Sequence, residues 1–149
     1  PYDHIAIWLM SEWKECGMNP NMITNPTSKF VQIRKEGGFD ATIDWAPSFL
    51  PDPTLMHFKY ISDDKTGSNY SNYVDRELDD LFDAQKGETD FEKRKALVHA
   101  FEKKALEDAY VLPVTYTDRV VPMHKSVKGF TIAFSHILNN TYRGVYLEN

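Results

Sequence analysis

Segments with the residue spacing of helices alternate along this chain with segments that have the spacing of strands. Residues 2–16 carry apolar side chains three or four positions apart, which places them on one face of a helix. Residues 39–45 instead alternate apolar and polar side chains, which is the period of a strand. Because chains that alternate helices with strands pack the helices against a sheet, the sequence predicts an α/β layer architecture.

The other elements follow from the same two patterns and from the residues that begin and end helices. Helices are predicted at residues 2–16, ended by Gly17, from a cap at Thr27 or Ser28 to Gly37, and at 55–60 after a cap at Asp52-Pro53. Two more are predicted at 75–85 and after a capping box at Thr89 and Glu92. The side chains predicted to face inward on these two helices are Leu78, Leu81, Phe82, Leu97, Phe101, Ala105 and Ala109. Strands are predicted at residues 21–25, 39–45 and 111–117, with further extended segments at 120–123, 130–134 and 145–147. We expect the polar residues 62–72 to form a surface loop. Cys16, on the apolar face of the first helix, is predicted to be buried.

The composition is that of a folded domain and argues against two kinds of partner. The chain has 149 residues, a net charge of −5 and a pI near 5.5. Its basic residues are scattered, so they do not form the clustered footprint of a nucleic-acid-binding protein. No apolar run approaches the ~20 residues that cross a bilayer. Aromatic residues, at 13%, are numerous enough to line a ligand site as well as a core.

The sequence offers no motif for catalysis, metal binding or a cofactor. The five histidines share no metal-ligand spacing, and neither a P-loop nor a dinucleotide-binding glycine pattern is present. The single cysteine, Cys16, has no histidine close to it in sequence that would activate it. We therefore expect a binding protein rather than an enzyme, with no catalytic residues, no metal and no cofactor.

Residues 44–53 have the features of a ligand-binding loop. The segment begins at the end of a predicted strand, and open α/β sheets bind ligands at the carboxyl ends of their strands. It carries two aromatic residues, Trp45 and Phe49, two acids, Asp44 and Asp52, and three prolines. The alternative interpretation is that Trp45 and Phe49 only pack the loop onto the core.

The order and spacing of several short motifs resemble those of a known family. The motifs are EWKECGM at 12–18, GFD at 38–40 before a strand ending in Trp45, DP at 52–53, NY at 72–73 ahead of ELDDL at 77–81, VLPV at 111–114 and VKGF at 127–130. No single motif is specific, but together they span nearly the whole chain. They resemble the C-terminal part of the bacterial extracellular solute-binding proteins of family five, the oligopeptide- and dipeptide-binding type that serves ABC importers.

This resemblance implies that the chain forms part of the second lobe of a two-lobed, periplasmic-binding-protein-like fold. Such a fold closes on its ligand by a hinge motion. Residues 1–134 would form the α/β lobe, and residues 135–149 a closing tail. Because the chain opens at Pro1 rather than Met, we interpret it as a cut-down chain with an N-terminal lobe missing. The resemblance also implies an ABC permease as partner. It implies a location in the cell envelope, either periplasmic or extracellular and membrane-associated.

The resemblance assigns ligand-binding residues to this sequence. They are Trp45, Ala46, Pro47, Ser48, Phe49 and Tyr116. Peptide-binding members of the family have an aspartate, which pairs with the amino group of the peptide, at the position of Ser48. An ammonium group buried without a carboxylate would be costly, so we expect no amino group to be held at Ser48. A peptide, a sugar and an aromatic acid all stay open as the small solute.

Two other functions compete with solute binding. A hydrolase could use Asp44 and Asp52 as unpaired acids, and it would need two carboxyl groups facing one cleft about 5–9.5 Å apart. An interaction module would use its aromatic surface only to dock the missing lobe, and Trp45 would then be covered by the chain.

Overall fold

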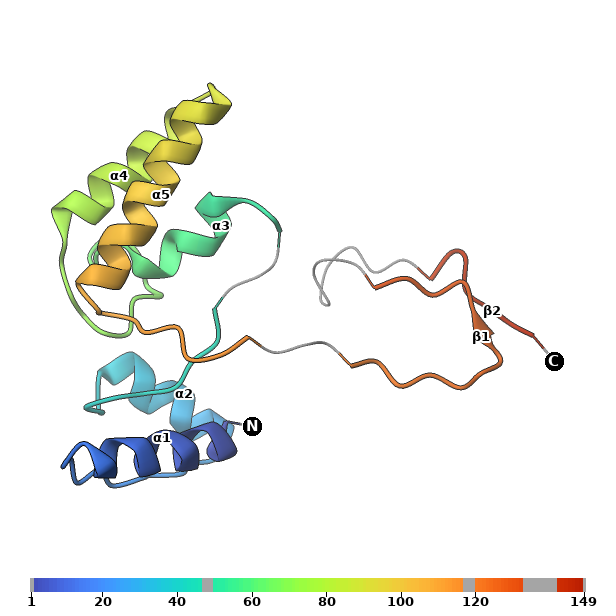
Figure 1. Ribbon diagram of the computed structural model, residues 1–149, viewed down its shortest axis with the longest axis horizontal. Helices are drawn as coiled ribbons and strands as arrows, with labels where there is room; N and C mark the ends of the chain where they lie inside the picture. The colour runs from blue at the N-terminus through green and yellow to red at the C-terminus, as the bar shows by residue number, and fades with distance from the viewer. Residues whose placement is uncertain (1, 47–49, 117–119, 133–141, 149) are drawn as a thin grey trace. The chain divides into compact units, whose positions relative to one another are not determined.

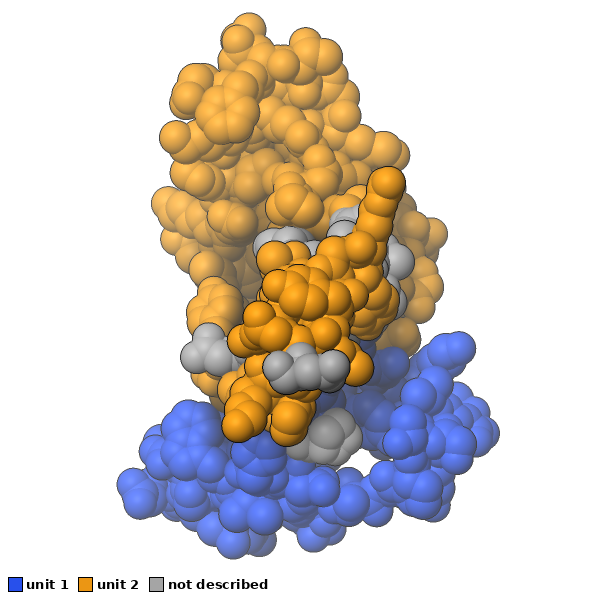
Figure 2. Space-filling model, turned by 90° about the vertical axis from the view of Figure 1, so that its right-hand side faces the viewer, with its two compact units in different colours: residues 1–45 blue, residues 46–149 orange. Residues whose placement is uncertain are grey.

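The computed structural model describes residues 2–46, 50–116, 120–132 and 142–148 (Figure 1). Its elements are α1 (Asp3–Glu15), α2 (Thr27–Glu36), α3 (Pro53–His57), the 3₁₀ turn η1 (Phe58–Tyr60), α4 (Arg76–Gly87), α5 (Phe91–Glu107), β1 (Val127–Lys128) and β2 (Tyr146–Leu147). The chain divides into two compact units, residues 1–45 and residues 46–149 (Figure 2). Each unit is described by itself below.

The first unit contains α1 and α2, and the end of α1 matches the prediction. The amide of Gly17 donates to the carbonyl of Lys14 at 3.0 Å, and the amide of Met18 donates to that of Trp13 at 2.9 Å. These two bonds form a Schellman motif, which needs a left-handed residue just beyond the helix. Gly17 meets that need with a φ of +84°.

Two predictions for this unit are wrong. The residue before α2 is Pro26, and no side chain caps that helix, so neither Thr27 nor Ser28 is the cap. Cys16 is exposed rather than buried. No described residue of this unit is fully buried, because its two helices cover their apolar faces only in part. An apolar helix face predicts burial only where a second layer lies against it.

The second unit is built around the pair of helices α4 and α5, which lie side by side (Figure 1). Most of the apolar residues predicted to face inward on these helices do so, but Ala109 is exposed and lies beyond the end of α5. The buried cluster consists of Ile61, Leu78, Phe82 and Phe101, with Phe58, Tyr60, Tyr73, Leu81 and Ala105 packed around it.

The cap of α5 is Asp90, whose carboxylate accepts from the amide of Lys93 at 2.9 Å, so the predicted capping box at Thr89 is wrong.

Most of the predicted strands are absent from the described residues. Residues 21–25, 39–45, 111–116 and 120–123 have irregular backbone in the structure. Among the described residues, strands are present only at β1 (Val127–Lys128) and β2 (Tyr146–Leu147), which pair antiparallel with Val127 opposite Leu147. The expectation for 145–147 is confirmed at β2. The described helices and their one two-stranded sheet are compatible with a mixed α/β fold, although the sheet is much smaller than predicted, and the two-lobed fold stays a prediction. A strand needs hydrogen bonds from a partner strand, and the described residues do not supply one for these segments. The proposed boundary between residues 134 and 135 lies outside the described residues.

Candidate functional site

The predicted ligand-binding residues fall in different parts of the structure. Trp45 is the last residue of the first unit and is 43% exposed, and the exposed Ala46 is the first residue of the second unit. Tyr116, in the second unit, is 97% exposed. The other three, Pro47, Ser48 and Phe49, lie outside the described residues. Trp45 and Tyr116 belong to different units, and each unit is described separately. A site that both residues form therefore stays a prediction.

The first acid of the candidate segment, Asp44, is paired with an arginine. The Nη1 group of Arg34 donates to Oδ1 of Asp44, and both side chains are largely buried. Arg34 lies near the end of α2, and its guanidinium is 5.4 Å from the centre of the Phe30 ring, within reach of a cation–π contact. Sequence reasoning missed this arginine. Its ten-residue separation from Asp44 does not correspond to contact within any single element.

The second acid, Asp52, has two roles at once. Its Oδ1 accepts from the amide of Thr54 at 2.9 Å and so caps α3, as the sequence predicted for Asp52 and Pro53. Both of its carboxylate oxygens also accept from Nη2 of Arg94, at 3.1 and 3.2 Å. Partial burial opposes the ionised form of Asp52, but the bonds from Thr54 and Arg94 outweigh it and lower the pKa of this carboxyl.

Arg94 connects the Asp52 cap to the helices behind it. Its Nη2 is also 3.2 Å from Oγ1 of Thr54, and its Nε donates to both the backbone carbonyl and the side-chain oxygen of Gln85, each at 3.2 Å. Gln85 is fully buried and donates in turn to Oγ1 of Thr54 at 3.1 Å. The start of α3 is therefore tied to α4 through Gln85 and to α5 through Arg94.

These pairs weaken the hydrolase interpretation. That interpretation requires Asp44 and Asp52 to be unpaired acids, and each is bonded to an arginine instead. A general acid also needs a raised pKa, whereas the pKa of Asp52 is lowered. Within the described ranges, no three His, Cys, Asp or Glu side chains come together as a group that could hold a metal ion.

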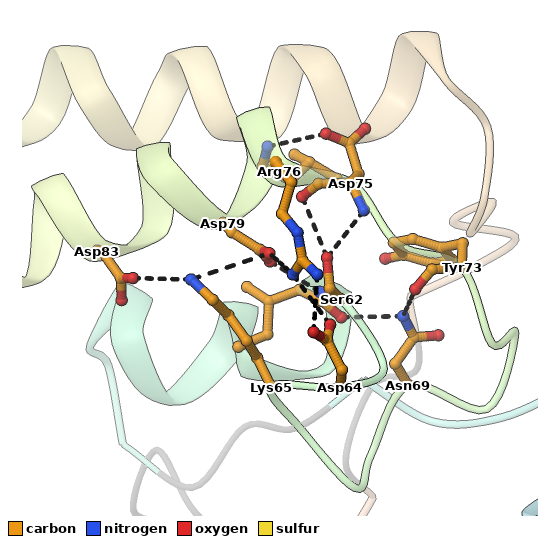
Figure 3. Close-up of polar contacts among 11 residues, drawn as sticks. Ser62, Asp64, Lys65, Asn69, Tyr73, Asp75, Arg76, Asp79 and Asp83 are labelled. Atoms are coloured by element: carbon orange, nitrogen blue, oxygen red, sulfur yellow. Dashed lines mark hydrogen bonds and ion pairs between the residues drawn. The ribbon is translucent and has the colours of Figure 1, made fainter.

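Residues 62–72 form the predicted loop, most of whose residues are exposed, and polar contacts join the loop to α4 (Figure 3). Ser62 and Asn69 are buried in it. The amide of Ser62 donates to Oδ1 of Asp79 at 2.9 Å, and its hydroxyl accepts from the amide of Asp75 at 2.8 Å. Nδ2 of Asn69 donates to the carbonyl of Ile61 at 2.9 Å. Ser62 and Asn69 are therefore internal hydrogen-bonding groups, which the polarity of the segment did not predict.

The buried carboxylate of Asp79 lies at the centre of this loop's ion pairs (Figure 3). It accepts from Nη1 of Arg76 at 2.9 Å, and Arg76 also pairs with Asp64 at 2.7 Å. Lys65 lies 3.0 Å from Asp83 and 3.9 Å from Asp79. Because each of these charged groups has an opposite charge within the network itself, we interpret it as structural rather than as a ligand site.

One hollow in the surface bears on where a ligand could bind. An open hollow of about 320 Å³ lies on the first unit, lined by Ile7, Met10, Ser11, Lys14 and Met22. It contains none of the predicted ligand-binding residues, so it does not support that site.

None of the described helices is both long enough and apolar enough to cross a membrane.

Two known proteins to which this chain is similar are binding proteins by name. One is a dipeptide-binding protein of Pseudomonas aeruginosa, which is 25% identical over 142 residues, or 95% of this chain. Another, from a second strain of that species, is named di/tripeptide-binding protein 3 and is 24% identical over 142 residues. The chain spans about a quarter of the length of these relatives, 26% in each case. No protein-family model matches the chain, and no solved structure matches it.

Proposed function

We propose that this chain is the C-terminal part of the substrate-binding component of an ABC importer that captures short peptides. The observation that carries the proposal is the similarity to two peptide-binding proteins over 95% of the chain. The similarity is weak, but it extends through both compact units rather than through one motif. The pairing of Asp44 and Asp52 with arginines supports the same conclusion, because the alternative hydrolase would need these two carboxyl groups unpaired.

The ligand loop in this proposal consists of Trp45, Ala46, Pro47, Ser48 and Phe49, with Tyr116 as a further contact. Aromatic side chains at both ends of this set would suit the apolar side chains of a small peptide. An N-terminal lobe would complete the site, and closure of the two lobes would bury the ligand. The protein would work in the cell envelope and deliver its ligand to an ABC permease.

A peptide is preferred to a sugar or an aromatic acid because both relatives are named for peptides. The serine at position 48 keeps one part of the ligand open. Without an aspartate there, the amino group of the peptide would need its carboxylate elsewhere in the protein. The proposed peptide is therefore recognised at Ser48 through its main chain or side chains and not through its charge.

Isothermal titration calorimetry tests this proposal on the complete native polypeptide that contains this sequence. We expect a panel of dipeptides and tripeptides to include ligands with a Kd of about 1 μM or tighter. Monosaccharides and aromatic acids of similar size serve as controls and should give no heat of binding. Native mass spectrometry of the protein purified from its host should show a bound peptide. Binding of the sugars or aromatic acids in place of peptides would contradict the proposal.

A further inference from the structure

His57 ends the short helix α3, which lies against the pair α4 and α5 (Figure 1). We propose that His57 makes the attachment of α3 to α5 sensitive to pH: the end of α3 lies on α5 at neutral pH and detaches from it in mild acid. This inference does not depend on the proposed function, because every contact that it uses lies within the second unit. Neither the sequence motifs nor the names of the relatives assign a role to this histidine.

The first step of the argument is the environment of the imidazole ring, which is buried. The ring stacks on that of Phe101 with the centres 4.8 Å apart, and its Nε2 lies 3.3 Å from Oε1 of Glu102. Its Nδ1 is buried and has no hydrogen-bond partner among the described residues. With the ring proton on Nε2, uptake of another proton would make Nδ1 a charged donor without an acceptor. Because such a group is costly to bury, the attached arrangement fits the neutral ring.

The second step concerns the charges that face the ring from each neighbouring element. On α5, Glu102 is the one charged group among the described residues that interacts with the ring. On α4, Gln85 bonds to the start of α3 and is neutral, and in η1 Lys59 lies over the ring of Tyr70. The carboxylate of Glu102 is 51% exposed, so water screens it. Burial therefore lowers the pKa of His57 in spite of this carboxylate.

The third step shows that only the last turn of α3 can detach. At the start of the helix, Asp52 accepts from Arg94, and the pKa of this carboxyl is lowered below 3.8. That ion pair therefore persists in mild acid. Directly after His57, the side chain of Phe58 packs against the buried cluster of the helix pair, to which His57 does not belong. Residues 55–57 are thus held at both ends by contacts that do not titrate with the imidazole.

The pH range of detachment follows from the two positions of the ring. A detached ring is open to water and has the ordinary histidine pKa of 6.5, whereas the attached ring has a lower pKa. Above pH 6.5 the ring is neutral in both positions, so a change of pH does not favour either of them. Below it, detachment becomes up to about tenfold more favourable for each pH unit, until the pH reaches the pKa of the attached ring.

Hydrogen exchange of the complete native polypeptide, measured at about pH 7.5 and about pH 5, tests this inference. Protection factors are compared, because they are corrected for the intrinsic effect of pH on exchange. The amide of Met56, which donates to Asp52 at 3.2 Å, should lose about tenfold of its protection in acid. The amide of Thr54, which donates to the Asp52 side chain, should keep its protection, and so should that of Leu78 on α4. Unchanged or increased protection of Met56 would overturn the inference, as would an equal loss at all three amides.

Variants of His57 test whether this histidine is the group that titrates. His57→Phe keeps a ring that can stack on Phe101 but cannot take up a proton, so Met56 should be equally protected at both pH values. His57→Gln is neutral without a ring and should show the same independence of pH, even if its protection is lower throughout. The exposed His99 of α5 provides the matched control, and H99Q should lose protection in acid as the wild type does. A loss of protection in acid that persists in H57F and H57Q would assign the effect to another group.

Glu102→Gln distinguishes detachment from the opposite effect, in which protonation tightens an ion pair between His57 and Glu102. A glutamine oxygen can still accept from the neutral ring, so E102Q should match the wild type at about pH 7.5. At about pH 5 the protonated ring lacks its partial compensation, and the loss of protection at Met56 should be at least about twofold larger. A smaller loss in E102Q than in the wild type would contradict the inference.

Discussion

The ring of His57 ends α3 and is buried against Phe101, with the ring centres 4.8 Å apart and the planes 11° from parallel. Its Nε2 lies 3.3 Å from Oε1 of Glu102. Its Nδ1 is buried and has no hydrogen-bond partner among the described residues. Burial lowers the pKa of His57 below 6.5, and the nearby carboxylate of Glu102 only partly offsets that effect. The neutral ring is therefore the form that fits the folded protein.

The lowered pKa of His57 predicts a loss of stability on mild acidification. Because the unfolded chain binds a proton more readily than the folded one, the contribution is complete above the unfolded pKa of 6.5 and is lost as the pH falls towards the folded pKa. The free energy of unfolding should fall below pH 6.5 with a slope of up to about 1.4 kcal/mol per pH unit. Urea denaturation at a series of pH values measures this slope, which His57→Gln should flatten. The exposed His99 on α5 provides the control, and an unchanged slope in H57Q would contradict the prediction.

Single residues also show where sequence reasoning reached its limit in the second unit. Leu78, Phe82 and Phe101 were predicted to face inward and are buried, because apolar spacing on a helix reports the core directly. Ser62 and Asp79 were not predicted to be buried. A polar side chain can be buried wherever partners for its hydrogen bonds exist, and these partners come from segments 13 to 17 positions away. Sequence patterns do not specify such pairings.

Helices and strands also differ in how well the sequence predicts them. The helices could be predicted to within a few residues, because their hydrogen bonds join residues four positions apart and their caps lie next to them. The C-terminal end of α1 and the N-cap of α3 were predicted correctly. The predicted N-cap of α2 lies one or two residues too late, and that of α5 lies one residue too early. The strands could not be predicted as reliably, because a strand exists only with a partner elsewhere in the chain.

The antiparallel pair β1 and β2 depends on a glycine. Gly129 has a φ of +73°, and a Cβ atom there would lie 2.0 Å from the carbonyl oxygen of Gly144. We expect Gly129→Ala to open this pair, because the left-handed backbone and the close approach both exclude a side chain. The amide of Glu148, which donates to Ser126 at 2.8 Å in the structure, should then exchange freely with solvent.

Gly67→Ala is the matched control for that change. Nothing lies within 4 Å of a Cβ placed at Gly67, so the variant should leave the exchange of Glu148 unchanged. Amides of α4 and α5 should keep their protection in both variants, because the buried cluster of these helices includes no residue of β1 or β2. Protection of Glu148 that survives in G129A would show that the pair tolerates a side chain at this position.

At the scale of the whole molecule, much of the apolar surface lies exposed. Leu112, Tyr116 and Val120 are exposed in the segment that follows α5, and Ile7 and Trp8 are exposed on α1. Singly exposed apolar residues are ordinary, but contiguous ones mark a surface that another layer covers. In the proposed function, an N-terminal lobe would be that layer.

The isolated 149-residue chain should therefore bind peptide far more weakly than the complete native polypeptide does. In a two-lobed binding protein each lobe supplies part of the contacts, and the affinity depends on closing both over the ligand. We expect the affinity of the isolated chain for the best dipeptide to be at least about 100-fold weaker by calorimetry. Circular dichroism provides the control, since the helices α4 and α5 should persist in the isolated chain and exclude simple unfolding as the cause. Equal affinity in the two proteins would mean that these residues form a complete site, and the two-lobed proposal would then be wrong.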